Sequence, residues 1–453
     1  MFPVDYQKHF KENFYLAFPV VLSQLGHVLV SVIDSIMVGR VGTLPLAAAS
    51  LGNSIFNLIM VFGLGLSFSI TPLVASAAGR KNKNRISLLL INGTLLCGLA
   101  GILLFLIGYL LTPFLPYLQQ PTAVLQLSIP YLHILLFSLI PLMFFQGFKQ
   151  VAEGLSLTRQ AMYISVVSNL LNVIGNYMLI YGKLGAPALG LNGAAISTLI
   201  SRIIMAGLMG WYIFFSDRMQ VYRLRWKSKF ISFRHLNRLV KIGLPISLQM
   251  FFEMGAFGFS AIMIGWLGAQ ELAAHQIAIS IASLTYMMAS GIAAAATIRV
   301  GHLNGSGHGL EMRTAGLSSI YMAIGFMLAT GLILISANNF IPTLYVQDTQ
   351  VIELAAGLLI IAALFQISDG VQVVGLGALR GLEDVKIPSF ISLLAYWVAG
   401  LPIGYLLCFK AGYGINGIWT GLLIGLSVAA LLLFFRFKKL SLKNKDDKKN
   451  AEK

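Results

Sequence analysis

One stretch of sequence occurs twice in the chain and decides its fold. Residues 16–24 read LAFPVVLSQ and residues 242–250 read IGLPISLQM, so a shift of 226 positions brings Pro19 onto Pro245. The same register continues without a gap over further pairs: Met37 with Met263, Gly39 with Gly265, Gly42 with Gly268, Leu46 with Leu272, Gly65 with Gly291 and Thr71 with Thr297. The chain therefore consists of two copies of one structural repeat.

The composition excludes a soluble protein. Of the 453 residues, 57% are apolar and only 11% are charged, whereas soluble domains carry about a quarter charged residues. A membrane helix needs roughly 20 mostly apolar residues, and apolar segments of that length recur between Pro, Gly, Asn and charged residues. We expect twelve spans, near residues 14–38, 50–78, 86–112, 130–152, 160–182, 190–215, 238–265, 275–301, 313–337, 352–378, 388–410 and 415–437.

Twelve spans give six to each copy of the repeat. An even number keeps both copies in the same orientation, so the predicted fold is an all-α integral membrane protein with two parallel-repeat six-helix bundles. Such a pair of bundles is typical of an alternating-access transporter, and a fused repeat makes a multi-subunit channel the weaker reading. The expected parts are an amino-terminal lobe (1–217), a basic cytoplasmic linker (218–241), a carboxy-terminal lobe (242–437) and a disordered basic tail (438–453).

The placement of the basic residues predicts the orientation of the spans. If the amino terminus is cytoplasmic, the inner segments hold 28 of the 32 Lys and Arg residues, and the outer connections hold only Arg40, Lys183 and Lys410. Arg202 remains inside a span. This split obeys the positive-inside rule, so we expect both termini in the cytoplasm. The net charge of +16 is then explained by anionic lipid headgroups and requires no nucleic-acid partner. We also expect no removable signal peptide before the first span.

Three acidic residues fall in the interior of the predicted spans: Asp34, Glu253 and Asp369. A charged carboxylate at the centre of a membrane helix costs about 2.5–3.5 kcal/mol, so each must face an interior cavity, be protonated or hold a cation. Burial favours the protonated form and a nearby cation favours the ionised form. Such a carboxyl group can exchange a proton for another cation as the cavity opens, and so couple ion flow to transport. The alternative is that hydroxyl or amide groups cap each carboxyl for helix packing.

The repeat does not duplicate these acids. In the 226-residue register Asp34 lies opposite Ser260, and Glu253 lies opposite His27. One acid therefore belongs to the amino-terminal bundle and two belong to the carboxy-terminal bundle. This asymmetry predicts that the two halves do different jobs.

Neutral oxygen donors accompany the amino-terminal acid. Three asparagines of the fifth predicted span follow one another at helical spacing and line one face, and a threonine stands in the sixth span; these residues are Asn169, Asn172, Asn176 and Thr198. Amide and hydroxyl oxygens beside a carboxylate suit a hydrated proton relay or a hard monovalent ion, although interhelical hydrogen bonding alone would also explain them. His27 precedes Asp34 by two helical turns and lies roughly on its face, as an accessory proton carrier or as a packing histidine.

Motifs for soluble chemistry do not occur in the sequence. It contains no phosphate-binding Walker loop, no cluster of Cys and His ligands and no Gly-x-Ser-x-Gly element, so no cofactor and no ATP are expected. Cys97 and Cys408 each stand in an apolar run and are interpreted as buried small hydrophobes. The chain holds 29 Phe, 16 Tyr and 17 Met. An aromatic cavity that contains carboxylates would attract large lipophilic cations.

Three segments resemble a known family. They are SVIDSIMVGRVGTLPLAAASLGNS (31–54), NLLNVIGNYMLIYGKLG (169–185) and LGAQELAAHQIAISIASLTYMM (267–288). All three look like the multidrug and toxic compound extrusion (MATE) family, close to its NorM-like branch, and the resemblance extends over about residues 10 to 437. It implies twelve helices in two lobes and efflux of organic cations in exchange for sodium ions or protons.

The resemblance also implies roles for single residues. Asp34 matches the acidic position of the family's first helix, and Asn172, Asn176 and Thr198 match polar residues around it. Glu253 and Asp369 match acids of the seventh and tenth helices, which are associated with cation binding in the carboxy-terminal lobe. Pro19 is similar to a first-helix proline linked to bending. Asn176 departs from relatives that carry an acid there, which favours sodium coupling at Glu253 and Asp369 over a two-carboxylate proton relay.

The expected function is secondary active efflux in a bacterial inner membrane. The substrates would be small lipophilic organic cations, the coupling ion sodium or a proton, and the protein a monomer that is not an enzyme. Glu253 and Asp369 are the candidate coupling-ion ligands; Asp34, with its Asn and Thr neighbours, is the candidate for proton or substrate coupling. Two alternatives remain: a flippase for lipid-linked saccharides of the same broader superfamily, whose cavity would be lined by basic residues, and an integral-membrane enzyme.

Overall fold

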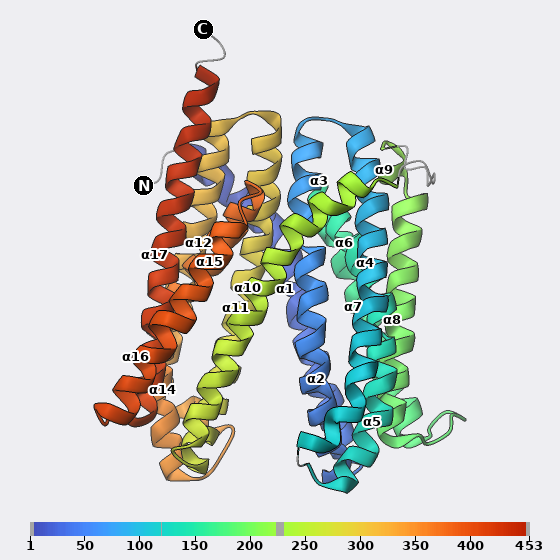
Figure 1. Cartoon of the computed structure of the whole chain (residues 1–453), viewed down its shortest axis with the longest axis vertical. Helices are drawn as coiled ribbons and strands as arrows, with labels where there is room; N and C mark the ends of the chain where they lie inside the picture. The colour runs from blue at the N-terminus through green and yellow to red at the C-terminus, as the bar shows by residue number, and fades with distance from the viewer. Residues whose placement is uncertain (1–3, 119, 223–230, 450–453) are drawn as a thin grey trace. The chain divides into compact units, whose positions relative to one another are not determined.

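Helices make up nearly all of the protein (Figure 1), and no strand occurs in the described residues. The computed structural model describes residues 4–118, 120–222 and 231–449. Its helices are α1 (Val4–Gly39), α2 (Thr43–Ser67), α3 (Ile70–Gly79), α4 (Lys83–Leu111), η1 (Thr112–Leu118), α5 (Thr122–Phe137), α6 (Leu139–Gly154), α7 (Thr158–Tyr181), α8 (Gly190–Phe215), α9 (Asp217–Gln220), α10 (Phe233–Gly265), α11 (Ala269–Ser306), α12 (Gly309–Ser336), α13 (Phe340–Thr343), α14 (Thr349–Gly381), α15 (Lys386–Leu393), η3 (Leu394–Gly400), α16 (Leu401–Tyr405), η4 (Leu406–Lys410) and α17 (Gly414–Lys449).

Twelve helical segments of the described chain are long and apolar enough to cross a membrane, from Tyr6–Gly39 to Gly414–Leu442. Several segments join two helices across a slight break, such as α2 with α3 and α5 with α6. Because lipid offers no hydrogen-bond partner, a membrane span must satisfy its backbone within the helix. The predicted all-α fold with twelve spans is confirmed.

The chain divides into two compact units that do not coincide with its two halves. The C unit comprises Met1–Val21 and Leu248–Lys453, and the N unit comprises Leu22–Ser247. We expected lobes that end at residue 217 and begin at residue 242. Instead, α1 and α10 are each divided between the units. The part of α1 up to Val21 packs in the C unit, and the part of α10 up to Ser247 packs in the N unit.

A proline precedes each of these divisions by the same distance. Pro19 lies inside α1 two residues before Val21, and Pro245 lies inside α10 two residues before Ser247. Proline lacks the backbone N–H and its ring crowds the preceding turn, which weakens a helix locally. The repeat seen in the sequence therefore places a helix-weakening residue at both points where the chain passes from one unit to the other.

A glycine allows close helix contact at the equivalent point of each unit. In the N unit, a Cβ atom added to Gly65 of α2 would lie 2.4 Å from Ser247 Cα of α10, and in the C unit one added to Gly291 of α11 would lie 2.3 Å from Val21 Cγ2 of α1. Neither distance is possible for a real side chain. The repeat pairs Gly65 with Gly291 and Val21 with Ser247, so both units use the same packing.

Polar contacts fasten the start of α1 to the C unit. The Asn13 amide donates to Ser318 Oγ over 2.9 Å, to Ser319 Oγ over 2.8 Å and to the Ala315 carbonyl over 3.1 Å. Glu12, the residue before Asn13, forms an ion pair with Arg299 of α11. Asn13 is fully buried, and buried amides stabilise a structure only when they find such partners. In Figure 1, the first turns of α1 lie at the same end of the C unit as the turn between α11 and α12.

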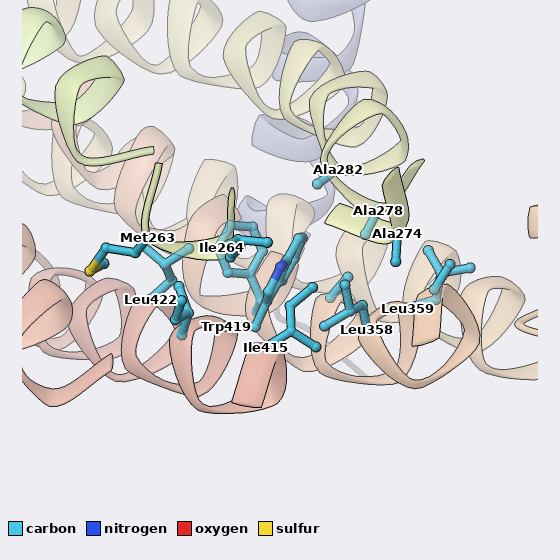
Figure 2. Close-up of a cluster of buried hydrophobic side chains, with 14 of the residues drawn as sticks. Met263, Ile264, Ala274, Ala278, Ala282, Leu358, Leu359, Ile415, Trp419 and Leu422 are labelled. Atoms are coloured by element: carbon cyan, nitrogen blue, oxygen red, sulfur yellow. The ribbon is translucent and has the colours of Figure 1, made fainter. Parts of the chain in front are cut away.

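The core of the C unit packs around a buried tryptophan. Trp419 of α17 lies among apolar side chains from α10, α11 and α14, including Ile264, Ala278 and Leu358 (Figure 2). Its ring nitrogen donates to His275 Nδ1 over 3.2 Å, which satisfies the polar edge of an otherwise apolar residue. This core holds α10 and α14, the two helices that carry the carboxy-terminal acids.

Two parts of the predicted organisation differ from the structure. Helix α17 continues to Lys449, where we expected a disordered tail from residue 438; a helix that is already formed extends at little cost through good helix formers such as Lys and Leu. The expected linker contains the short helix α9 and the start of α10, and residues 223–230 of it lie outside the described residues.

Candidate functional site

Asp34 of α1 accepts hydrogen bonds from two asparagines of α7 in the N unit. Asn176 Nδ2 donates to Asp34 Oδ1 over 2.5 Å. Asn172, with its amide turned so that both of its polar atoms find partners, donates to the same oxygen over 3.1 Å and accepts from Thr198 Oγ1 over 3.2 Å. One helical turn separates the two asparagines, so they face Asp34 together. The structure thus brings Asn172, Asn176 and Thr198 into one cluster with Asp34, whereas the buried Asn169 Nδ2 has no recorded hydrogen-bond partner among the described residues.

The second carboxyl oxygen of Asp34 is left available. Both asparagines donate to Oδ1, and within the described residues no hydrogen bond to Oδ2 is recorded. An ionised carboxylate offers about four lone-pair positions. Asp34 can therefore accept a proton or a substrate N–H at Oδ2 without breaking its contacts to α7.

His27 is not joined to Asp34 by a hydrogen bond in the described part of the chain. Its electrostatic neighbours are Lys149 and Arg202, and Lys149 is itself paired with Glu153 one turn further along α6, with Nζ and Oε1 3.7 Å apart. His27 and Asp34 are seven residues apart on the continuous helix α1, and no proton-sharing contact between them is recorded in the described chain. The accessory role of His27 stays a prediction.

A cation that the sequence left unassigned belongs to the same unit. Arg202 lies one helical turn after Thr198 on α8, and its guanidinium donates to Ser138 Oγ over 2.5 Å. It stands 4.8 Å from the centre of the Phe56 ring, and it interacts electrostatically with Asp34 and Tyr131. The signal in the sequence was an arginine at the middle of a span, where a charge is expensive and usually functional.

Glu253 of α10 is held by three donors in the C unit. Gln249 Nε2 donates to Oε2 over 3.0 Å, while Gln372 Nε2 and the Tyr396 hydroxyl each donate to Oε1 over 3.4 Å. Arg380 donates to Gln249 Oε1 over 2.9 Å, so the guanidinium acts on Glu253 through the Gln249 amide. Both carboxyl oxygens of this buried acid are thus engaged.

Asp369 of α14 lies beside this network but outside it. The residue is 3% exposed, and no hydrogen bond to its carboxyl group is recorded among the described residues. It interacts electrostatically with Glu253, and Gln372, which bonds Glu253, follows it by one helical turn. The structure therefore brings the two predicted carboxy-terminal acids together and leaves the oxygens of one of them open to a ligand.

A stretch of π-helix positions Tyr396. This residue lies in η3, where the helix widens, and its one hydroxyl hydrogen is shared between Gln372 Oε1 at 2.8 Å and Glu253 Oε1 at 3.4 Å. The next residue, Trp397, donates from its ring nitrogen to the Phe252 carbonyl over 3.0 Å. Short π-helical segments are frequent at functional sites because they redirect side chains. Nothing in the sequence pattern announced this change of helix type, so Tyr396 was missed.

The two clusters differ in charge. Asp34 and Arg202 balance each other in the N unit, whereas Glu253 and Asp369 exceed Arg380 by one negative charge in the C unit. Among the described residues no group of three or more His, Cys, Asp or Glu could hold a metal ion. A cation in the C unit would therefore depend on carboxylate oxygens together with neutral hydroxyl or amide oxygens, which suit hard monovalent ions.

Comparison with known sequences identifies close relatives over nearly the whole chain. The sequence profile of the MatE family matches residues 19–178 and 245–406. Multidrug resistance protein MdtK of Yersinia pseudotuberculosis serotype O:1b (strain IP 31758) is 36% identical over 430 residues, which cover 93% of this chain and 94% of that protein. MdtK of Yersinia enterocolitica serotype O:8 is 35% identical over the same coverage. These matches confirm the predicted family.

Solved structures show the same fold. A eukaryotic MATE transporter, AtDTX14, is similar with a TM-score of 0.88 at 23% identity, over 98% of this chain and 99% of that one. A multidrug resistance MATE family transporter in an outward-facing conformation is similar with a TM-score of 0.88 at 22% identity, over 97% of both chains. At these identities the likeness concerns the fold alone.

Proposed function

The chain belongs to the MatE family of membrane transporters, and from this premise we propose that it exports lipophilic organic cations in exchange for sodium ions, with protons as the alternative coupling ion. The family assignment makes it a multidrug efflux transporter of a bacterial inner membrane and not an enzyme, as the sequence predicted. The matches do not favour a lipid-linked saccharide flippase. We further propose a monomer with both termini in the cytoplasm.

The coupling-ion site is proposed at Glu253 and Asp369. The observation that carries this assignment is the pair of buried acids in one cluster, of which Asp369 has no recorded hydrogen bond within the described chain. Two neighbouring carboxylates repel each other unless a cation lies between them or one is protonated. Entry of a cation relieves this repulsion, and its departure restores it, so the cluster can alternate between two electrostatic states as the transporter works.

Sodium is favoured over the proton because the two acids can offer it carboxylate oxygens, which are ligands for hard monovalent cations. The Gln249 and Gln372 amides and the Tyr396 hydroxyl donate hydrogens to Glu253, so they hold that carboxylate in place for the ion. In the N unit, Asn176 offers Asp34 an amide and not a second carboxylate, which does not favour a two-carboxylate proton relay. Asp34 would then serve proton or substrate coupling through its open Oδ2.

The test is efflux of a fluorescent organic cation from proteoliposomes. An inward sodium gradient and an inward proton gradient are imposed separately at matched membrane potential, with wild type, Asp34→Asn, Glu253→Gln and Asp369→Asn, each checked for insertion and monodispersity. We expect drive by sodium that disappears in Glu253→Gln and Asp369→Asn. Exposed Glu353 lies on the same helix as Asp369, so Glu353→Gln is the matched control and should retain efflux.

Other outcomes would change the assignment. Drive by protons alone that survives in Asp369→Asn and is lost in Asp34→Asn would move coupling to the N unit. Efflux that neither gradient accelerates would overturn the antiporter. Wild-type rates in both carboxy-terminal variants would show that these acids serve packing only.

A further inference from the structure

The proposed antiport leaves one intramembrane cation of the N unit, the partly buried Arg202, without a task. Arg202 stands in the middle of α8, the span Gly190–Phe215, where a charged side chain is costly and is retained only with partners or a function. Neither the cation exchange at Glu253 and Asp369 nor the contacts of Asp34 with α7 requires a positive charge here. The surroundings of Arg202 therefore call for a separate explanation.

Neighbouring side chains hold the guanidinium in place without satisfying it. Ser138, which is fully buried, accepts one hydrogen bond from Nη1, and the buried Phe56 ring lies under the guanidinium. A guanidinium has five N–H donors. Within the described residues, the bond to Ser138 is the single hydrogen bond recorded for this group, so its other four N–H donors have no recorded acceptor.

Asp34 does not neutralise Arg202 directly. The two groups interact electrostatically, but no ion pair between them is recorded in the described part of the chain, and Oδ1 of Asp34 is occupied by the two asparagines. Tyr131 interacts electrostatically with both charges, and its hydroxyl bonds Asn53 Oδ1 over 3.1 Å. The interior of the N unit thus presents a separated negative and positive group, each with free hydrogen-bonding capacity.

We propose that Arg202 determines specificity by receiving a carboxylate group of amphoteric substrates, whose cationic nitrogen faces Asp34. Guanidinium binds carboxylate with two parallel hydrogen bonds, a geometry that ammonium lacks. A ligand that carries both charges matches the separated pair, whereas a purely cationic ligand leaves Arg202 unmatched. This inference rests on the proposed efflux function and names a substrate class for the N unit.

The experiment uses two fluorescent dyes that differ in a single group. Rhodamine 110 carries a free carboxylate, and rhodamine 123 is its methyl ester. Binding to the purified full-length protein is measured by fluorescence polarisation, and efflux is measured in proteoliposomes. We expect Arg202→Gln to weaken binding and efflux of the acid by about tenfold or more and to leave those of the ester within about twofold. Arg202→Lys keeps the positive charge but cannot make the two parallel hydrogen bonds. Its binding and efflux of the acid should lie between those of wild type and Arg202→Gln.

Two further variants guard the interpretation. Arg40 is an exposed arginine in the connection between α1 and α2. The control Arg40→Gln should change the binding and efflux of neither dye. Ser138→Ala removes the hydrogen bond that holds the guanidinium and keeps the charge, so it tests the proposal if Arg202→Gln fails to fold. Ser138→Ala should weaken binding of the acid dye about threefold and leave binding of the ester dye unchanged.

Several results would overturn the proposal. Equal losses for acid and ester in Arg202→Gln and Ser138→Ala would make Arg202 a packing residue, and no loss for either dye would leave it without a binding role. If added potassium chloride abolishes the difference between the dyes at a constant sodium concentration, the occupant is an inorganic anion and not the substrate. Failure of wild type to expel either dye would refute the efflux function, while the binding ratio of acid to ester would still test Arg202.

Discussion

The two units hold their acids in opposite ways. In the N unit, Asp34 is anchored through one oxygen by amide donors and interacts electrostatically with an arginine. In the C unit, Glu253 accepts from three donors, while Asp369 has none recorded in the described chain. The helices that carry these residues come from one duplicated repeat. Two copies of one scaffold can therefore carry different binding sites. The N unit is suited to a ligand with both charges, and the C unit is suited to a cation.

The largest effect should separate the two units directly. Asp369→Asn removes the carboxylate with the open oxygens and should lower sodium-driven efflux about 100-fold, because a cation held between two carboxylates loses one of its charged ligands. Asp34→Asn should leave sodium-dependent protection against thermal unfolding intact, since bound ligand stabilises the folded state that binds it. Initial efflux rates and melting curves with and without sodium check both parts. Loss of sodium protection in Asp34→Asn would contradict the division of labour.

Close packing should respond alike in both units. Gly65→Ala and Gly291→Ala each place a Cβ within 2.4 Å of a neighbouring helix, and such overpacking costs about 1–3 kcal/mol. Thermal unfolding in detergent should show similar losses for the two variants. The controls are Gly207→Ala in the N unit and Gly325→Ala in the C unit, where a Cβ meets nothing within 4 Å. A loss confined to one variant would show that the repeat has diverged in packing as well as in charge.

The anchoring of the two divided helices should differ in kind. Asn13 of α1 makes three buried polar contacts, whereas its counterpart in the repeat, Leu239 of α10, is a fully buried apolar residue. Asn13→Ala should cost about 1–2 kcal/mol, because the serine hydroxyls lose their donor. The exposed Asn416 provides the control Asn416→Ala, which should be neutral. An unchanged melting temperature in Asn13→Ala would show that the polar contacts of Asn13 do not stabilise the attachment of α1.

The smallest effect concerns the order within the C unit. Tyr396→Phe removes the hydroxyl that bonds Gln372 and Glu253, and the apolar ring still fills its place. We expect sodium affinity to fall about threefold, since a neutral hydrogen bond contributes about 1 kcal/mol, with little change in melting temperature. Sodium titration of the efflux rate measures this. A loss as large as that of Asp369→Asn would place the hydroxyl among the direct ligands of the ion.

Much of the fold could be predicted from the sequence. Apolar runs of membrane length and the doubled Pro19 and Pro245 segments defined twelve spans and two repeats. The division of α1 and α10 between the units could not be predicted, because a linear repeat suggests that each half folds on itself. The contacts of Gly65 with Ser247 and of Gly291 with Val21 reveal the exchange, as do the hydrogen bonds of Asn13 to α12.

The candidate sites were predicted unevenly. Asp34 and its partners were found because carboxylate and amide groups at helical spacing are conspicuous in an apolar span. Gln372 and Tyr396 were missed because a neutral polar residue in a span is usually a packing contact, and the π-helical turn that directs Tyr396 has no sequence signal. Arg202 was visible as an intramembrane charge, but its partners Ser138 and Phe56 come from helices that are distant in sequence.

The exchange of the first helical segments imposes an order on synthesis. Residues 4–21 are synthesised well before the residues that hold them, which lie between Ala289 and Ser319 in the second half of the sequence. Before these residues are synthesised, the beginning of α1 can insert into the membrane but lacks the helices against which it packs. The two halves cannot mature one after the other as independent domains usually do. If they are produced as separate polypeptides, each must lend its opening segment to the other before either is complete.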